Sequence, residues 1–325
     1  MQIMANKEYN LDLRDQKIIY ELEKDARTSV SDIAKRLKTS KQLVSYKIKK
    51  LEENKVIEGY HAIIDTSRLG FTSYRVYLKF QNLTLKKREE ILAFLTNLNE
   101  VTILLTIDGR WDVGFAIMVK YIYNFYEVWG RIIQYKQFIE LYHISIYSPI
   151  YHFTRKFLSL DKNVIPKILI LGGKEKAEFD ELDIQILKEL SPNARKPLTE
   201  ISNKLKKPIQ SIINRVKSLE KRQIIQGYRP ILNWNLLGYD YYKVDISLSS
   251  HKREQELFIF CKLHKFIFQV DKTIGGSDFE LELYAKNKKH FREIMQEIQN
   301  KFNDVFKNYA YFTLIKTYKE TFFPN

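Results

Sequence analysis

The sequence predicts an α+β fold in which a three-helix module and a β-α-β-β-α-β sandwich each occur twice. Three observations support this prediction. A long internal repeat divides the 325-residue chain, helical periodicity marks three short helices in each copy, and alternating apolar segments with two amphipathic helices follow each copy. We therefore expect four lobes arranged as two tandem pairs.

The repeat becomes visible when the chain is shifted against itself by 168 residues (179 minus 11). This shift aligns residues 11–71 with residues 179–239 without a gap, and about a third of the aligned positions are identical. The segment LEENKVIEGYHAIIDTSRLGF, for example, aligns with LEKRQIIQGYRPILNWNLLGY. Chance does not maintain one register over that length, so two copies of one module are expected.

Each copy contains three short amphipathic helices joined by short turns. In the first copy, apolar residues recur at helical spacing within 18–22, 30–37 and 44–51. Ser29 with an aspartate three residues later is typical of a capping box, and Ser40 stands where the third helix needs its N-cap. The tight turn before the third helix predicts a helix-turn-helix, and the segment VIEGYHAII after it indicates a strand beside a short wing.

The polar face of the third helix carries the residues that we expect to bind DNA. Amides and hydroxyls on such a face bind base edges in the major groove, whereas basic side chains bind phosphates. The segment 27–50 holds eight basic residues and one acidic residue, although a lysine-rich helix face is also common as plain solvated surface. The expected DNA-binding residues of the first copy are Arg27, Ser40, Lys41, Gln42, Ser45, Tyr46, Lys47 and Lys49.

The second copy is expected to bind DNA with a relaxed base preference. Ile213 stands at the position of Ser45, and Pro208 replaces the capping Ser40. Proline is tolerated in the first turn of a helix, so the helix survives without its side-chain cap. The expected DNA-binding residues of this copy are Arg195, Lys207, Gln210, Ser211, Asn214, Arg215 and Lys217.

After each three-helix module the pattern becomes mixed. The first half contains, in order, TSYRVYLKF, KKREEILAFLTNL, EVTILLTID, WDVGFAIMV, IYNFYEVWGRIIQ and QFIELYHISIY, which alternate between strand and helix periodicity. The same order recurs in the second half, from YYKVDISLS to YAYFTLIKTY. This order predicts a ferredoxin-like sandwich in each half.

These patterns predict five segments. They are a winged helix-turn-helix at 1–65, a ferredoxin-like domain at 66–154, a linker at 155–178, a second winged helix-turn-helix at 179–234 and a second ferredoxin-like domain at 235–325. The linker contains proline, glycine and a charged run, and its segment KILIL is a candidate short strand. Its composition leaves the relative placement of the two halves open.

The charge balance predicts a polyanionic partner. The chain has 54 lysines and arginines against 39 acidic residues, a formal net charge of +15. Nucleic acid and an acidic membrane surface would both fit this charge, and a basic protein without a polyanionic partner is the alternative. The sequence shows no apolar run long enough for a membrane span and no apolar leader at its start, which favours the cytoplasm. The single Cys261 excludes an intrachain disulfide and a cysteine-based zinc cluster. We expect no metal, no cofactor and no catalytic residue.

On these motifs the chain resembles two copies of the Lrp/AsnC, or feast/famine, family of transcription regulators. The first helices LDLRDQKIIYEL and FDELDIQILKEL match the aspartate-rich first helix of that family, and both copies keep its Ile-x-Gly-Tyr ending. A Gly-x-x-Asp turn between the middle strands of the sandwich is matched by Gly109 and Asp112 and by Gly275 and Asp278. The resemblance implies a small effector, such as an amino acid, near these four residues, although the turns also suit a purely structural role.

The resemblance has further implications. Members of the family usually carry one unit per chain and pair through their ferredoxin-like domains, so the tandem copies imply an intrachain pseudo-dimer or a homo-oligomer. Two unequal third helices would suit an asymmetric operator. The usual arginine of the third helix is Lys47 here, which keeps the charge but loses the bidentate geometry.

Two other functions are alternatives. The architecture also resembles siroheme decarboxylases, in which paired units enclose a tetrapyrrole. That function requires histidine and arginine side chains on one pocket, and His143 and His152 lie on or just after a strand, where histidines are more often structural. An architectural protein that coats DNA with little sequence preference is the other alternative, favoured by the high charge and the weaker second copy.

Overall fold

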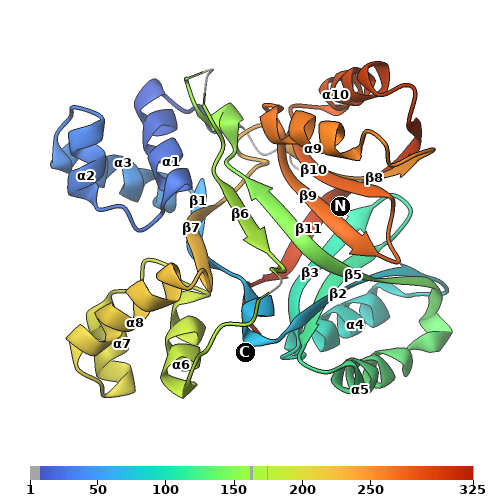
Figure 1. Ribbon diagram of the computed structural model, residues 1–325, viewed down its shortest axis with the longest axis horizontal. Helices are drawn as coiled ribbons and strands as arrows, with labels where there is room; N and C mark the ends of the chain where they lie inside the picture. The colour runs from blue at the N-terminus through green and yellow to red at the C-terminus, as the bar shows by residue number, and fades with distance from the viewer. Residues whose placement is uncertain (1–7, 162–163, 174, 325) are drawn as a thin grey trace.

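Each half of the chain begins with three short helices, as the repeat predicts. They are α1 (Leu13–Lys24), α2 (Val30–Arg36) and α3 (Lys41–Glu53) in the first half, and α6 (Glu181–Leu190), α7 (Leu198–Leu205) and α8 (Ile209–Lys221) in the second. The computed structural model describes residues 8–161, 164–173 and 175–324. Figure 1 shows the two three-helix modules side by side at one end of the molecule.

The helix caps follow the sequence signals. The side chain of Ser29 accepts a hydrogen bond from the backbone N–H of Asp32, and the side chain of Ser40 accepts one from Leu43. The second module has Pro197 and Pro208 at the two equivalent N-caps, neither of which offers a side-chain acceptor. The first module therefore has the better defined third helix at its N-terminus.

Each module contributes one strand, and these two strands pair with each other. β1 (Ile57–Ile64) runs antiparallel to β7 (Ile225–Leu232) in a two-stranded ribbon, with His61 directly opposite Arg229. His61 and Arg229 are also equivalent positions of the repeat, so a local pseudo-twofold axis passes between them. The strand expected beside a wing is present in each copy, but its partner is the strand of the other copy.

The β-α-β-β-α-β order is present in both halves. The first half contains β2 (Thr72–Phe80), α4 (Leu85–Asn97), β3 (Val101–Asp108), β4 (Val113–Val119), α5 (Ile122–Ile133) and β5 (Ile139–Phe153). The second contains β8 (Asp240–Leu248), α9 (Glu254–Leu263), β9 (Ile267–Ile274), β10 (Phe279–Ala285), α10 (Lys288–Lys301) and β11 (Phe306–Glu320). The predicted α+β class with two ferredoxin-like sheets is confirmed.

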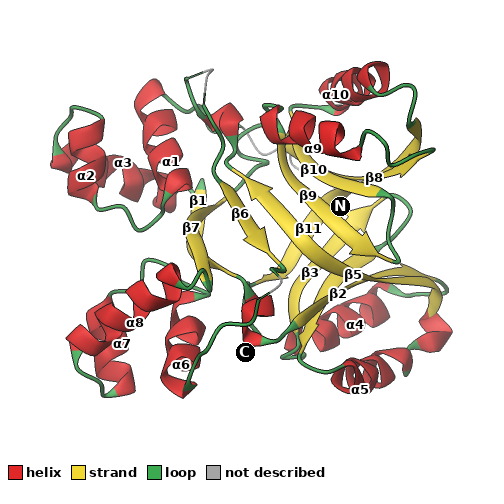
Figure 2. Ribbon diagram, viewed as in Figure 1, coloured by secondary structure: helices red, strands yellow, loops and turns green. Residues whose placement is uncertain are grey.

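The two sheets join edge to edge and close on themselves. The strand order is β2-β4-β3-β11-β8-β10-β9-β5-β6, and an additional pairing of β2 with β5 closes all strands except β6 into a barrel. β5 of the first half pairs with β9, an edge strand of the second sheet. In the same way, β11 of the second half pairs with β3, an edge strand of the first sheet. Figure 2 shows α4 and α5 outside one part of the barrel and α9 and α10 outside another.

Alternation along the strands separates an apolar outer face from a polar inner face. The outward residues pack under the helices in two apolar clusters, and examples are Val76, Leu78, Val244, Ile246 and Leu281. The residues that alternate with them along the same strands include Arg75, Tyr77, Lys243, Asp245, Glu280 and Glu282. Since successive strand residues point to opposite faces, these charged side chains lie inside the barrel.

The predicted linker is partly structured. It contains a short 3-10 helix, η3 (Lys156–Leu158), and the strand β6 (Ile168–Leu171), which pairs with the end of β5 and confirms the KILIL strand. Two other 3-10 turns, η1 (Thr66–Leu69) and η2 (Lys136–Phe138), precede β2 and β5. Strand pairing thus defines the relative placement of the two halves, which the sequence left open.

Among the described residues, no helix has the length and apolar character needed to cross a bilayer.

Reciprocal contacts hold the two helical modules together beside the ribbon. The N–H of Ala26 donates to the carbonyl of Tyr228 (3.0 Å), and the N–H of Ala194 donates to the carbonyl of Tyr60 (2.8 Å). The guanidinium of Arg27 lies 5.4 Å from the ring centre of Tyr228, and its repeat equivalent, Arg195, lies 4.9 Å from the ring of Tyr60.

We predict that Arg27→Ala and Arg195→Ala each lower the free energy of unfolding by about 1–2 kcal/mol, because each removes a cation–π contact and a hydrogen bond. Arg27 donates to the carbonyl of Ala194, and Arg195 donates to the hydroxyl of Tyr60. Urea unfolding would measure the loss. Arg14→Ala, which removes the same charge from an exposed position, is the matched control. Equal stability of all three variants would contradict this role.

Candidate nucleic-acid interface and barrel pocket

The first candidate interface is the solvent-facing side of α3. Buried Val44, Ile48 and Leu51 hold the helix against its module. The opposite side is open to solvent and carries amide, hydroxyl and ammonium groups, and the Tyr46 side chain is 61% exposed. The predicted residues found exposed here are Ser40, Lys41, Gln42, Ser45, Tyr46 and Lys49. The face therefore has the chemistry of a major-groove binding surface.

Lys47 departs from the prediction. Its side chain is only 11% exposed and forms ion pairs with the carboxylates of Asp12 and Asp15 on α1, the latter at 3.2 Å. The hydrogen bond from Lys47 lowers the pKa of Asp12 to about 2. Lys47 therefore ties α3 to α1, and we remove it from the proposed DNA-binding set.

Arg215, the repeat equivalent of Lys47, has the same role in the second module. Its guanidinium lies 2.7 Å from Asp180 and 3.3 Å from Asp183, both at the start of α6. Arg27 and Arg195 are likewise engaged between the modules, as described above. These three arginines stabilise the helical modules, and we also correct their assignment.

The second candidate interface, on α8, is similar but less regular. Lys207, Gln210, Asn214 and Lys217 are exposed, and Ser211 is half-buried. The amide of Gln210 donates to the side-chain oxygen of Asn214 at 3.0 Å, so these two groups partly satisfy each other. Fewer free polar groups are available here than on α3.

The two Gly-x-x-Asp turns are well ordered by their own contacts. Asp112 accepts hydrogen bonds from the N–H of Phe80 (2.7 Å) and the ammonium of Lys79 (2.9 Å), and Asp278 accepts one from the N–H of Leu248 (2.8 Å). A Cβ atom at Gly109 would lie 2.9 Å from the carbonyl oxygen of Tyr311, so only glycine fits there. These contacts account for the motif structurally, and an effector role for Gly109, Asp112, Gly275 and Asp278 stays a prediction.

A cavity of about 750 Å³ lies between the β1–β7 ribbon and the inner face of the barrel. His61 and Arg229 line it from the ribbon, and Arg75 and His152 line it from β2 and β5. Arg155, which follows β5, completes a group of three arginines and two histidines. The volume is in the range of small-molecule sites.

One carboxylate serves two of these arginines. Glu23, whose side chain is fully buried on α1, lies 3.0 Å from the Nη1 of Arg155 and 3.6 Å from the Nε of Arg229. Burial, together with the charges of Arg155 and Arg229, lowers the pKa of His61 to about 3, and burial also lowers the pKa of His152. Both imidazoles are therefore neutral at physiological pH, next to fixed positive charge.

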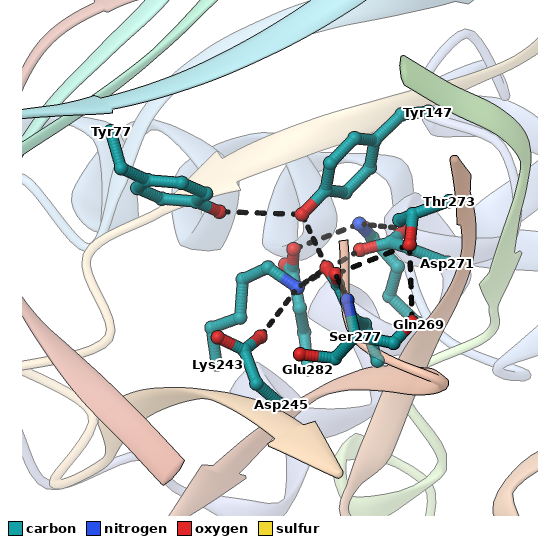
Figure 3. Close-up of polar contacts among 10 residues, drawn as sticks. Tyr77, Tyr147, Lys243, Asp245, Gln269, Asp271, Thr273, Ser277 and Glu282 are labelled. Atoms are coloured by element: carbon teal, nitrogen blue, oxygen red, sulfur yellow. Dashed lines mark hydrogen bonds and ion pairs between the residues drawn. The ribbon is translucent and has the colours of Figure 1, made fainter. Parts of the chain in front are cut away.

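A second polar cluster lies deeper in the barrel (Figure 3). The ammonium of Lys243, only 1% exposed, lies 2.5 Å from Glu280, 3.5 Å from Asp271 and 3.6 Å from Asp245. Tyr147 donates a hydrogen bond to Glu280. Burial alone would lower the pKa of Lys243, but these carboxylates, Glu280 first, raise it well above its ordinary value. Lys243 is therefore charged and holds the cluster together.

The cluster contains more carboxylates than cations. Glu282 lies beside it, accepts a hydrogen bond from Gln269 at 2.9 Å and also lines the cavity. Burial, together with the charge of Asp271, raises the pKa of Glu282 to about 7. Burial also raises the pKa of Asp271 itself. The barrel interior thus retains a proton that an exposed carboxyl group would lose.

Sequence reasoning found only His152 of this interior. His143 lies on β5 but stacks on Trp111 at 6.2 Å and does not line the cavity. His61, Arg229, Arg75 and Lys243 were missed, although a signal exists: each pair, 61 with 229 and 75 with 243, occupies equivalent repeat positions within an apolar strand. A polar side chain at the same position of both copies, within an otherwise apolar strand, indicates an inward-facing role.

Sequence families match both helical modules. A winged helix-turn-helix DNA-binding family matches residues 11–58, and the AsnC-type helix-turn-helix domain matches residues 179–220.

Individual relatives each match between 34% and 39% of the chain. Regulatory protein AsnC of Haemophilus influenzae is 27% identical over 126 residues, which are 39% of this chain and 83% of that protein. The HTH-type transcriptional regulator Ptr1 of Methanocaldococcus jannaschii is 33% identical over 113 residues, 34% of this chain and 73% of that protein. The leucine-responsive regulatory protein of Rhizobium meliloti is 28% identical over 125 residues, 38% of this chain and 80% of that protein.

One solved fold matches nearly the whole chain. The siroheme decarboxylase NirDL superposes with a TM-score of 0.62 at 13% identity, covering 94% of this chain and 92% of that one. Its complex with an iron-uroporphyrin III analogue gives a TM-score of 0.63 at 12% identity, covering 96% and 94%. At this identity the likeness shows a shared tandem fold.

We predict that Glu282 makes the protein less stable as pH rises. Its pKa is about 7 in the folded state and ordinarily 4.5, so the folded state binds the proton more tightly. Stability is therefore lost as pH rises from about 4.5 through 7, by up to about 3 kcal/mol. Urea unfolding between pH 5 and 8 should show a smaller loss for Glu282→Gln than for the unmodified chain. Exposed Glu293→Gln should leave the pH profile unchanged; an identical profile for both variants would refute the assignment.

Proposed function

Because this chain belongs to the Lrp/AsnC family of DNA-binding transcription regulators, we propose that it binds double-stranded DNA sequence-specifically with α3 in the major groove. The exposed side of α3 carries this proposal. It offers amide and hydroxyl groups for base edges beside lysines for phosphates, while apolar residues hold the helix in place from behind. The proposed contacts of this helix are Ser40, Lys41, Gln42, Ser45, Tyr46 and Lys49.

We propose that α8 binds a second, weaker half-site. Its contacts would be Lys207, Gln210, Ser211, Asn214 and Lys217. The β1–β7 ribbon relates the two helices by a pseudo-twofold axis, as in a dimeric regulator, but within one chain. Because the two helices differ in sequence, an asymmetric operator suits this arrangement.

The pairing of the two ferredoxin-like sheets supports an intrachain pseudo-dimer. An amino acid effector near the Gly-x-x-Asp turns is a further part of the proposal, supported by the name of the leucine-responsive relative. The curated relatives are regulators, which supports a function without catalysis.

We predict that Gln42→Ala together with Tyr46→Ala lowers the discrimination between operator and random duplex by about 1–3 kcal/mol per lost base contact. Duplexes selected from a random pool would supply the operator, and fluorescence anisotropy would measure both affinities. The matched control is Gln210→Ala with Asn214→Ala on α8, which should reduce discrimination less.

Salt dependence tests DNA binding itself, and the comparison of specific with random duplex separates this function from that of a DNA-coating protein. Six to ten neutralised phosphates give a logarithmic salt slope of roughly that number. If the α3 variant loses affinity equally for specific and random duplexes, the coating protein is favoured. If the affinity of the unmodified chain for duplex does not change with salt, a DNA-binding function is contradicted.

A second function is favoured by one observation. The barrel cavity brings His61 and His152 together with Arg75, Arg155 and Arg229, the combination expected for a site that binds a tetrapyrrole with acidic side chains. The shared fold of siroheme decarboxylase NirDL, over nearly the whole chain, supports the same candidate. The chain would then be an enzyme that acts on a tetrapyrrole.

We predict no change in the visible absorption of siroheme when the protein is added, if the regulator function is the complete one. Histidine ligation or burial of the macrocycle would shift and intensify its bands. A saturable shift that disappears in His61→Gln and His152→Gln, but not in His143→Gln, would establish that the cavity binds a tetrapyrrole.

A further inference from the structure

The barrel cavity contains buried polar groups that lack partners. They include guanidinium N–H groups and neutral His61, which has one N–H donor and one acceptor nitrogen. Among the described residues, the Nε of Arg75, the Nε of Arg155 and both ring nitrogens of His61 have no hydrogen-bond partner. His61 is 4% exposed and lines the cavity, with the nearby carboxylate of Glu320 at 4.0 Å from its Nδ1. Buried N–H groups without acceptors are costly, so these groups point to a ligand that supplies acceptor oxygens.

Unpartnered hydrogen-bond donors, rather than net charge, favour an acidic ligand. Arg155 and Arg229 share the single carboxylate of Glu23, so one positive charge there is not balanced by that contact. Four carboxylates also line the cavity, Glu58, Asp240, Glu282 and Glu320, so net charge alone does not select an anion. Selection comes from the unpartnered guanidinium donors, which form their strongest hydrogen bonds with carboxylates.

Three aromatic rings line the cavity beside Arg155. Trp234, Phe268 and Tyr284 line the cavity, with ring centres 4.1 Å apart for Trp234 and Tyr284 and 4.6 Å for Phe268 and Tyr284. The guanidinium of Arg155 lies 5.0 Å from the ring of Trp234. A ligand with a flat apolar frame and two or more carboxylates would contact the arginines and the aromatic rings at once.

The same residues connect the cavity to the DNA-binding modules. Glu23 is in the last turn of α1, and α1 is tied to the recognition helix α3 through Asp12, Asp15 and Lys47. Arg229 is on β7, which follows α8 after a short turn. A ligand carboxylate that draws Arg155 and Arg229 away from Glu23 would therefore remove two ion pairs that hold the end of α1 to Arg155 and to β7.

We propose that the barrel cavity binds an aromatic polycarboxylate on Arg75, Arg155 and Arg229, and that this ligand changes DNA affinity by competing with Glu23. The proposal rests on the DNA-binding function proposed above and assigns its regulation to a site separate from the Gly-x-x-Asp turns. Coupling of this kind is reciprocal, so DNA also changes the affinity for the ligand.

The test uses the full chain and two probes, benzene-1,2,4-tricarboxylate as a small acid and uroporphyrin III as a macrocyclic one. Calorimetry measures binding of each probe, and fluorescence anisotropy measures the duplex Kd with and without it. We expect at least one probe to bind and to change the duplex Kd by about threefold or more. The probe that does so shows whether the cavity accepts a small aromatic acid or a macrocyclic one. The triamide of the small acid should not bind, and excess L-leucine should not displace the probe.

Variants locate the site. Arg75→Gln should weaken probe binding about tenfold or more, the scale of one charged hydrogen bond. Leu105→Trp keeps every charge and fills the cavity, so it should abolish binding even if Arg75→Gln fails to fold. Exposed Arg292→Gln on α10 should change nothing. Glu23→Gln should still bind the probe, but the probe should then alter the duplex Kd much less.

Three results would overturn the proposal: neither probe binds, binding survives in both Arg75→Gln and Leu105→Trp, or the probe binds without changing the duplex Kd. The duplex titration without probe tests the DNA-binding function separately. Its failure leaves probe binding measurable by calorimetry, so the two failures are distinguishable.

Discussion

Main-chain pairing between the two halves is the interaction on which the rest of the structure depends. β5 pairs with β9, β11 pairs with β3, and the pairing of β2 with β5 completes the ring. Each ferredoxin-like sheet alone would leave β3 or β9 as an open edge with unpaired N–H and C=O groups. Both β5 and β11 are 15 residues long, so each has the length to pair within its own sheet and then with the other.

Closing the ring changes the environment of every inward-facing residue. In an open sheet, Arg75, Lys243 and Glu282 would face water, and their charges would cost little. Inside the barrel they are buried, and each charge needs a partner or a bound proton. Lys243 is surrounded by carboxylates and stays charged, whereas Glu282 has a raised pKa. The barrel interior therefore holds buried side chains whose charge states are set by their neighbours, and one end of it lies under the ribbon and the helical modules.

Fusion of the two copies allows positions near the pseudo-twofold axis to differ. His61 faces Arg229, and Arg75 corresponds to Lys243 inside the barrel. A dimer of identical chains would place the same residue on both sides of such an axis. The same freedom applies to the DNA-binding end, where Ser40 caps α3 but Pro208 begins α8 without a side-chain cap. One half can thus specialise in base recognition while the other contributes most of the acidic groups of the barrel interior.

The sequence by itself determined the duplicated module, the helix-turn-helix with its caps, the β-α-β-β-α-β order and the exposed side of α3. These features depend on periodicity and spacing over short distances along the chain, so they are visible without coordinates. Only the tertiary structure decided that Lys49 is exposed while Lys47 is held by Asp12 and Asp15, and that Arg27 and Arg195 join the modules. It also decided that β1 pairs with β7 and that His61, Arg75 and Arg155 meet in one cavity. The reason is that helix packing within a module and strand pairing across more than 160 residues bring together side chains that are distant along the chain, and no local pattern records those contacts.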